Sequence, residues 1–136
     1  MSSVCIDGPA EKLLRRSAVH VWPDTTLREV AEILERESIG LVLVRREGGF
    51  AGVVSERDIV RAVAEGLDLD VERAADVMTY EIAYIDGGDS IDHVADLMLA
   101  GDMRHVAVRG ADGHVGVLSV RDVVPVLLAE LARRSA

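Results

Sequence analysis

The chain has 136 residues, of which 49% are hydrophobic, and it carries a formal net charge of −9. This length supplies about one domain, the apolar content excludes a disordered chain, and the longest apolar stretches are far too short to span a bilayer. The negative charge argues against nucleic acid or an anionic membrane as the main partner, while an N-terminus without a continuous apolar segment and a single cysteine predict a cytoplasmic protein.

The first predicted elements are a leading helical turn over residues 10–17 and a short extended run over residues 19–22. An amphipathic helix follows, because apolar residues recur at helical spacing at Leu27, Val30, Ala31 and Leu34. Thr26, with Glu29 three residues later, predicts a capping box at the start of this helix.

A hairpin and a second helix complete this unit. Apolar strands are predicted over residues 41–45 and 50–55, and the Glu47-Gly48-Gly49 turn between them indicates antiparallel pairing. The second helix starts at about Glu56. Residues 67–79 then form an acidic linker whose last part leads into the next unit.

Residues 83–127 repeat residues 19–63 without a gap, at a shift of 64. The equivalent elements are an extended run over residues 83–85 and a helix capped by Ser90. A hairpin of strands 105–109 and 114–119 follows, and a last helix starts at Val120. The expected fold is α/β, in its α+β form, with two tandem β-α-β-β-α repeats over 11–66 and 75–132. They are related by pseudo-two-fold symmetry, each with a small sheet covered by helices.

The best-preserved run is Gly-Val-Val-Ser-Glu-Arg-Asp at 52–58, echoed as Gly-Val-Leu-Ser-Val-Arg-Asp at 116–122. One interpretation is structural, since Ser-x-x-Asp caps a helix N-terminus. The other is functional. A strand that ends at serine and opens into a helix presents free amides, a hydroxyl, a guanidinium and a carboxylate, which suit a sugar phosphate. Capping does not require the arginine, which recurs as Arg57 and Arg121.

With these motifs the chain resembles the cystathionine-β-synthase (CBS) domain family, as a tandem pair known as a Bateman module. The resemblance covers about residues 11–130 and includes Asp-Val-Met-Thr at 76–79 and Met-Arg-His-Val-Ala-Val at 103–108. It implies a regulatory, non-catalytic module that needs no cofactor and binds an adenine nucleotide or S-adenosylmethionine in clefts between the repeats.

The resemblance also implies roles for particular residues. Asp58 and Asp122 are expected to hold ribose, with Ser55 and Ser119 beside them. The candidate phosphate contacts are Arg57, Arg121 and Arg104. Val54 and Leu118 are candidates for an apolar cleft wall, although core packing explains them equally well. Arg104 has Gly40 as its counterpart, so the two copies are not equivalent.

Neither catalysis nor a metal site is expected. The four histidines have no ligand-like spacing, and no nucleophile lies beside a base in the sequence. Structural or surface roles are the expectation for each histidine.

The last helix is apolar around much of its circumference, at Val123, Val124, Val126, Leu127, Leu128 and Leu131. Something should cover this excess, and the resemblance to tandem CBS modules implies a homodimer, with residues 8–17 of the same chain as the alternative cover. Pro125 lies inside this helix and is a potential kink.

The sequence leaves three functional hypotheses open. The leading hypothesis is a ligand sensor that acts on an unidentified regulated protein. The alternative is an interaction or dimerisation module with vestigial clefts, in which the Ser-x-x-Asp runs serve only as caps. An unrecognised small enzyme has the least support.

Overall fold

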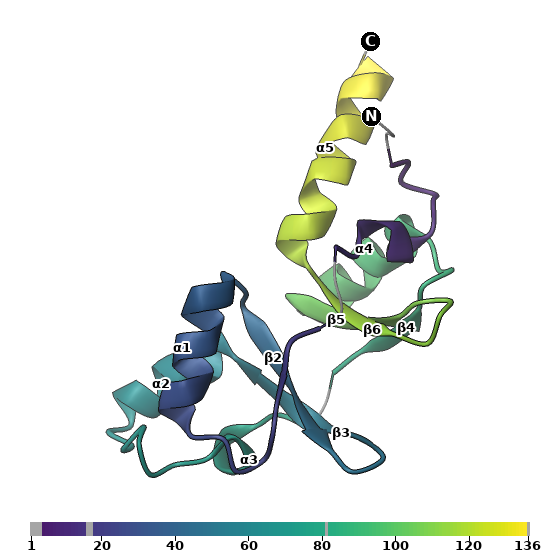
Figure 1. Cartoon of the computed structure of the whole chain (residues 1–136). Coiled ribbons are helices and arrows are strands. Elements are labelled where there is room, and N and C mark those ends of the chain that lie inside the picture. Colours follow the sequence, from purple (N-terminus) through teal and green to yellow (C-terminus); the bar gives the residue numbers. More distant parts are fainter. Residues whose placement is uncertain (1–3, 16–17, 81, 136) are drawn as a thin grey trace. The chain divides into compact units, whose positions relative to one another are not determined.

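The computed structural model describes residues 4–15, 18–80 and 82–135, and the chain divides into two compact units (Figure 1). Residues 18–82 form the first unit, and residues 83–136 together with the N-terminal 17 residues form the second unit. No helix in the described ranges is long and apolar enough to cross a membrane.

The first unit is a three-stranded sheet with helices. Its elements in chain order are β1 (His20–Val21), α1 (Leu27–Glu37), β2 (Leu41–Arg46), β3 (Gly49–Ser55), α2 (Glu56–Ala64) and α3 (Ala74–Val77). The strand order is β1-β2-β3, with β1 parallel to β2 and β2 antiparallel to β3. The core consists of Val21, Val30, Leu34, Val42, Val44, Val54 and Ala74. The predicted hairpin and helices are therefore confirmed.

The second unit repeats this architecture. Its elements are η1 (Ala10–Leu13), β4 (Tyr84–Asp86), α4 (Ile91–Ala100), β5 (His105–Arg109), β6 (Val115–Ser119) and α5 (Val120–Ser135). The strand order is β4-β5-β6 with the same senses of pairing. The core consists of Ala10, Ile85, Ile91, Val94, Met98, Val106, Val108, Leu118, Val123 and Val126. The α+β fold class predicted from the sequence is confirmed.

Helix caps and turns follow local chemistry. The hydroxyl of Thr26 accepts from the amide of Glu29 at 3.2 Å, and Ser90 accepts in the same way from the amide of His93 at 3.1 Å. These bonds satisfy helix N-terminal amides that have no partner within the helix. The β2–β3 turn needs Gly48, whose φ of 84° is in the left-handed region.

The leading segments pack in an exchanged manner that the sequence did not indicate. Residues 10–14 precede the first repeat but pack in the second unit, whereas residues 74–79 precede the second repeat but pack in the first unit. Equivalent backbone hydrogen bonds hold the two leading segments in place. The amide of Ala10 donates to the Asp89 carbonyl at 2.7 Å, and the amide of Ala74, 64 residues later, donates to the Thr25 carbonyl at 2.8 Å. The second unit therefore contains chain from both sides of the linker, while the first unit includes the linker itself.

The predicted N-terminal helical turn is confirmed over Ala10–Leu13 as a 3-10 helix, while residues 16 and 17 lie outside the described ranges. Several partly buried apolar residues of the N-terminal segment pack against the same core cluster as Val123 and Val126 of α5. The N-terminal segment therefore covers part of the apolar surface of the second unit. Helix α5 continues past Pro125 to Ser135.

Candidate functional site

The first candidate run forms a capping box where β3 passes into α2. The Ser55 amide and hydroxyl donate to Asp58 Oδ2 at 2.8 and 3.0 Å, and the Asp58 amide donates to the Ser55 hydroxyl oxygen at 3.2 Å. Arg61, one turn further along α2, donates to Asp58 Oδ1 at 3.4 Å. Asp58 is only 6% exposed, so its charge is both covered and compensated.

The second run has similar geometry where β6 passes into α5. The Ser119 amide and hydroxyl donate to Asp122 Oδ2 at 2.8 and 3.1 Å. Asp122 is partly exposed rather than buried. The residue three positions after the aspartate is Arg61 in the first unit and Pro125 in the second. Within the described ranges no side chain donates to Asp122 Oδ1. The two carboxylates therefore share one arrangement but differ in how far their hydrogen-bonding capacity is used.

The expectation of free backbone amides is wrong for most of the helix start. The amides of Ser55 and Asp58 are used by the capping box, and the Glu56 amide donates to the Gly40 carbonyl at 3.0 Å. The reason is that the serine and the aspartate satisfy two of these amides locally, while the Gly40 carbonyl, just before β2, satisfies the third. An anion at this edge would have to be held mainly by side chains.

Three arginines lie near the runs with their side chains in solvent. Arg57 and Arg121 occupy the second position of α2 and α5, and both are exposed. The structure also brings Arg104 to the second run, because its carbonyl accepts from the amide of Val120, the first residue of α5, at 2.9 Å. Within the described ranges no interaction ties any of these three guanidinium groups to another side chain. They are therefore available to an anionic ligand.

The glycine that opens each run has a packing role that sequence reasoning missed. A Cβ at Gly52 would lie 2.6 Å from the carbonyl oxygen of Thr79, and a Cβ at Gly116 would lie 2.5 Å from Leu14 Cδ2. In the first unit Thr79 also exchanges two backbone hydrogen bonds with Val53. Each glycine therefore lets a leading segment lie directly on the strand that ends in the serine. The recurrence of glycine three residues before serine was the signal available in the sequence.

Val54 and Leu118 point into the cores of their units. Val54 is 0% exposed and Leu118 is 1% exposed, and both belong to the core clusters. This burial favours the packing alternative over a role as a cleft wall for either residue.

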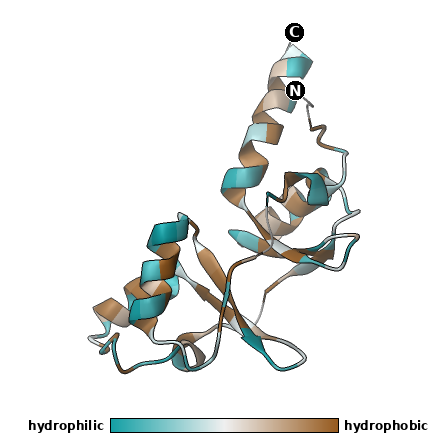
Figure 2. Cartoon of the chain, in the orientation of Figure 1, coloured by the Kyte–Doolittle hydropathy of each residue, from teal (hydrophilic) through white to brown (hydrophobic). Residues whose placement is uncertain are grey.

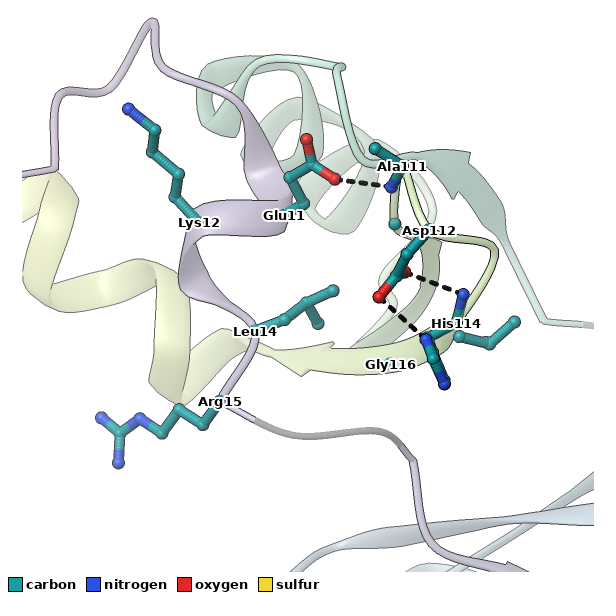
Figure 3. Close-up of a pocket in the computed structure, with 10 residues that line it drawn as sticks. Glu11, Lys12, Leu14, Arg15, Ala111, Asp112, His114 and Gly116 are labelled. Carbon is teal, nitrogen blue, oxygen red and sulfur yellow. Dashed lines mark hydrogen bonds and ion pairs between the residues drawn. The ribbon is translucent and has the colours of Figure 1, made fainter.

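Two hollows border the leading segments. One of about 220 Å³ in the first unit is lined by Asp58, Arg61, Ala62, Glu65, Leu67, Asp76 and Val77. Another of about 620 Å³ in the second unit is lined by residues of the N-terminal segment and of the β5–β6 turn (Figure 3). Only the first hollow reaches a carboxylate of a candidate run.

Figure 3 shows how the N-terminal segment is fastened to the second unit. Leu14 points toward β6 at Gly116, and Glu11 Oε2 accepts from the Ala111 amide at 2.9 Å. In the same turn, the amide and then the imidazole of His114 donate to Asp112 and hold the pKa of that carboxyl below its usual range. These contacts fix the turn and hold the segment in place.

The histidines do not converge. His20 packs edge-on against Trp22, with the two rings 5.7 Å apart, and His93 is exposed. Across residues 4–15, 18–80 and 82–135, no group of three or more histidine, cysteine, aspartate or glutamate residues is arranged to hold a metal ion.

Comparison with known proteins identifies both repeats. The CBS domain family model matches residues 10–65 and 74–129. A CBS domain protein from Pyrobaculum aerophilum, solved in complex with AMP, is 36% identical, with a TM-score of 0.78 over 92% of this chain and 98% of that one. A CBS domain pair solved with 5′-methylthioadenosine and S-adenosyl-L-methionine is 20% identical, with a TM-score of 0.78 over 90% and 97% of the two chains, and shares the fold.

Among curated proteins, an uncharacterised 17.7 kDa protein of Acidianus ambivalens is 29% identical over 111 residues. The match covers 79% of this chain and 66% of the Acidianus protein, so this chain spans just under two thirds of that relative's length.

Proposed function

The chain belongs to the CBS domain family, and on that basis we propose that it is a regulatory, non-catalytic module that binds adenosine-containing ligands at its Ser-x-x-Asp runs. The observation that carries the proposal is the recurrence of one arrangement in both units: strand, serine, arginine and aspartate at the start of a helix. The AMP complex of the Pyrobaculum relative supports the choice of ligand.

In this proposal the aspartates bind ribose. A carboxylate accepts hydrogen bonds from two vicinal hydroxyl groups, and Asp122 has one oxygen outside the cap for this purpose. The exposed guanidinium groups of Arg104 and Arg121 contact phosphate, because charge-assisted bonds from arginine suit its oxygens. Arg57 has the corresponding role beside Asp58. Val54 and Leu118 support the strands from inside the cores rather than touching the ligand.

The ligand class is AMP, ADP, ATP or S-adenosylmethionine, which share the adenosine group. The number of phosphates that the site accepts depends on the exposed arginine side chains. We place the protein in the cytoplasm, where these ligands are abundant, and expect the bound state to be read by a separate regulated protein.

A second function is favoured by a specific observation. The hydrogen bonds of Ser55 with Asp58 satisfy the requirements of a helix cap completely, with no need for a ligand. In addition, α5 exposes an apolar stripe at Val120, Val124, Leu128 and Leu131, of which Leu128 is 59% exposed. Figure 2 shows hydrophobic stretches, in brown, along α5. A dimerisation module with vestigial clefts would have both features. Dimer formation through the α5 stripe is compatible with ligand binding, and we propose it as well.

Calorimetry at near-physiological salt separates the two functions. We expect AMP, ATP or S-adenosylmethionine to give binding heat, with GMP weaker than AMP. A ligand at about 100 times its dissociation constant should raise the folding free energy by about 2.7 kcal/mol, which a thermal melt detects. If no adenosine ligand gives heat or a melting shift, the sensor function is refuted and the interaction module remains.

A further inference from the structure

The repeat allows the surroundings of the two aspartates to be compared position by position, and three differences stand out. Arg61 in α2 corresponds to Pro125 in α5, and Glu65 corresponds to Ala129. On the leading segments, Asp76 corresponds to Lys12. Because the leading segments are exchanged, Asp76 packs in the unit of Asp58 and Lys12 packs in the unit of Asp122.

The first difference concerns the carboxylates themselves. Both oxygens of Asp58 are engaged, Oδ2 by the cap and Oδ1 by Arg61 at 3.4 Å, and the Asp58 side chain is 7% exposed. Asp122 has the same cap on Oδ2, but proline at position 125 offers no donor, and Asp122 is more exposed. A ribose diol needs free acceptor oxygens. It can therefore bind Asp122 directly, whereas at the nearly buried Asp58 it competes with Arg61 for Oδ1.

The other two differences concern charge. The hollow beside Asp58 is lined by three carboxylates, those of Asp58, Glu65 and Asp76, against the single guanidinium of Arg61. The equivalent positions in the second unit hold Ala129 and Lys12, so they add an ammonium group and no carboxylate. Surface charges of this kind act over roughly a Debye length of about 8 to 10 Å. An anionic phosphate is therefore disfavoured beside Asp58, and the second unit has no carboxylate at the positions equivalent to Glu65 and Asp76.

We infer that the two half-sites are unequal and that Arg61 makes them so, as an internal counter-ion that occupies Asp58. An adenosine phosphate then binds first at Asp122 and more weakly at the Asp58 run, where its ribose competes with Arg61. The inference rests on the proposed function, since it concerns which of the two runs takes the ligand. Arg61 is a specificity-determining residue here, and it acts through Asp58.

The test is calorimetry on the whole chain and on paired variants, with AMP to count the sites and with uncharged adenosine to compare the variants. Wild type should bind one AMP per chain, with any second site weaker by about tenfold or more. Arg61→Gln frees Asp58 Oδ1 and should tighten the second site for adenosine, which carries no phosphate for the guanidinium to attract, by about two- to fivefold, the range expected for a partly exposed ion pair. Arg36→Gln, at an exposed arginine in the last turn of α1, is the matched control and should leave both sites unchanged.

The reverse substitution, at Pro125, gives a second measurement. The binding affinity of this variant would not change if the role of the residue at this position were only structural. Pro125→Arg places a guanidinium three residues after Asp122 and should weaken the first site for uncharged adenosine by about two- to fivefold. Pro125→Ala removes the same proline without adding a donor, so it should bind AMP as wild type does. Opposite effects of R61Q and P125R, with P125A neutral, support the inference.

The inference and the proposed function fail in different ways. Two equal AMP sites in wild type, or an R61Q variant that binds as wild type does, would overturn the inference and leave the ligand-binding function standing. Absence of AMP heat in wild type and in every variant would overturn the proposed function and the inference with it.

Discussion

Substituting the two run-opening glycines tests whether the leading segments are exchanged between the units. A Cβ at Gly52 meets the backbone oxygen of Thr79 at 2.6 Å, whereas a Cβ at Gly116 meets the flexible end of the Leu14 side chain at 2.5 Å. Backbone cannot rotate away from a clash, but a leucine terminus can. Gly52→Ala should therefore destabilise the protein more than Gly116→Ala.

The magnitudes follow from what has to move. In Gly52→Ala the overpacking costs about 1–3 kcal/mol, and displacement of Thr79 weakens its two bonds with Val53, at 2.9 and 2.8 Å, each of which contributes about 0.5–1.5 kcal/mol. We expect a loss of about 2–4 kcal/mol. In Gly116→Ala a changed Leu14 rotamer costs about 0.5–1.5 kcal/mol, which the lower chain entropy of alanine partly offsets, so about 0–1 kcal/mol should remain.

Urea unfolding followed by circular dichroism measures both losses. Gly88→Ala is the matched control, because a Cβ there meets nothing within 4 Å, and this variant should be neutral or slightly more stable than wild type. The m-values should stay constant if the unfolded state is unaffected. A Gly52→Ala variant as stable as Gly88→Ala would refute the packing of the 74–79 segment on β3, and with it the exchange.

Three further predictions concern the site and the surface. Asp122→Ala should weaken AMP binding by about ten- to a hundredfold by calorimetry, and more than Asp58→Ala does; equal loss of stability with normal binding in both would leave capping as the only role of the runs. Leu128→Asp should turn a dimer into a monomer by light scattering, because a buried unpaired carboxylate costs several kcal/mol, and a monomeric wild type at high concentration would contradict this. His114→Ala should move the pKa of Asp112 part of the way up to its usual value by NMR titration, because the imidazole hydrogen bond is lost while the bond from the backbone amide of residue 114, the larger cause of the lowered pKa, remains. The stability from the lowered pKa is present at neutral pH and is lost as pH falls through the folded-state pKa, and an unchanged titration would mean that the imidazole has no share in the shift.

Local order was predictable from the sequence because it depends on neighbours in the chain. Helical spacing and the serine or threonine caps located α1 and α4, and the glycine turns located both hairpins. The pairing of Asp58 with Arg61 lies one helical turn apart and was equally open to prediction.

The exchange of the leading segments was not predictable, since it rests on contacts between residues far apart in the chain. Thr79 pairs with Val53, and Leu14 packs on Gly116. These segments are short, and no periodic pattern marks which sheet they join. The steric reason for the glycine in each run was hidden for the same reason.

Capping and ligand binding place different demands on Asp122, and one substitution separates them. The cap uses only Oδ2, which accepts from the Ser119 amide and hydroxyl, and ribose binding requires the other oxygen as an acceptor. In Asp122→Asn the side-chain carbonyl can keep the cap, but the amide nitrogen has no lone pair to accept a ribose hydroxyl. We therefore expect Asp122→Asn to retain most of the stability that Asp122→Ala loses, about 1 kcal/mol for a cap, while AMP affinity falls about as far as in the alanine variant. Urea unfolding and calorimetry on the two variants measure the two properties independently. If Asp122→Asn binds AMP as wild type does, the free oxygen of Asp122 is not a ribose acceptor, and the carboxylate serves the helix alone.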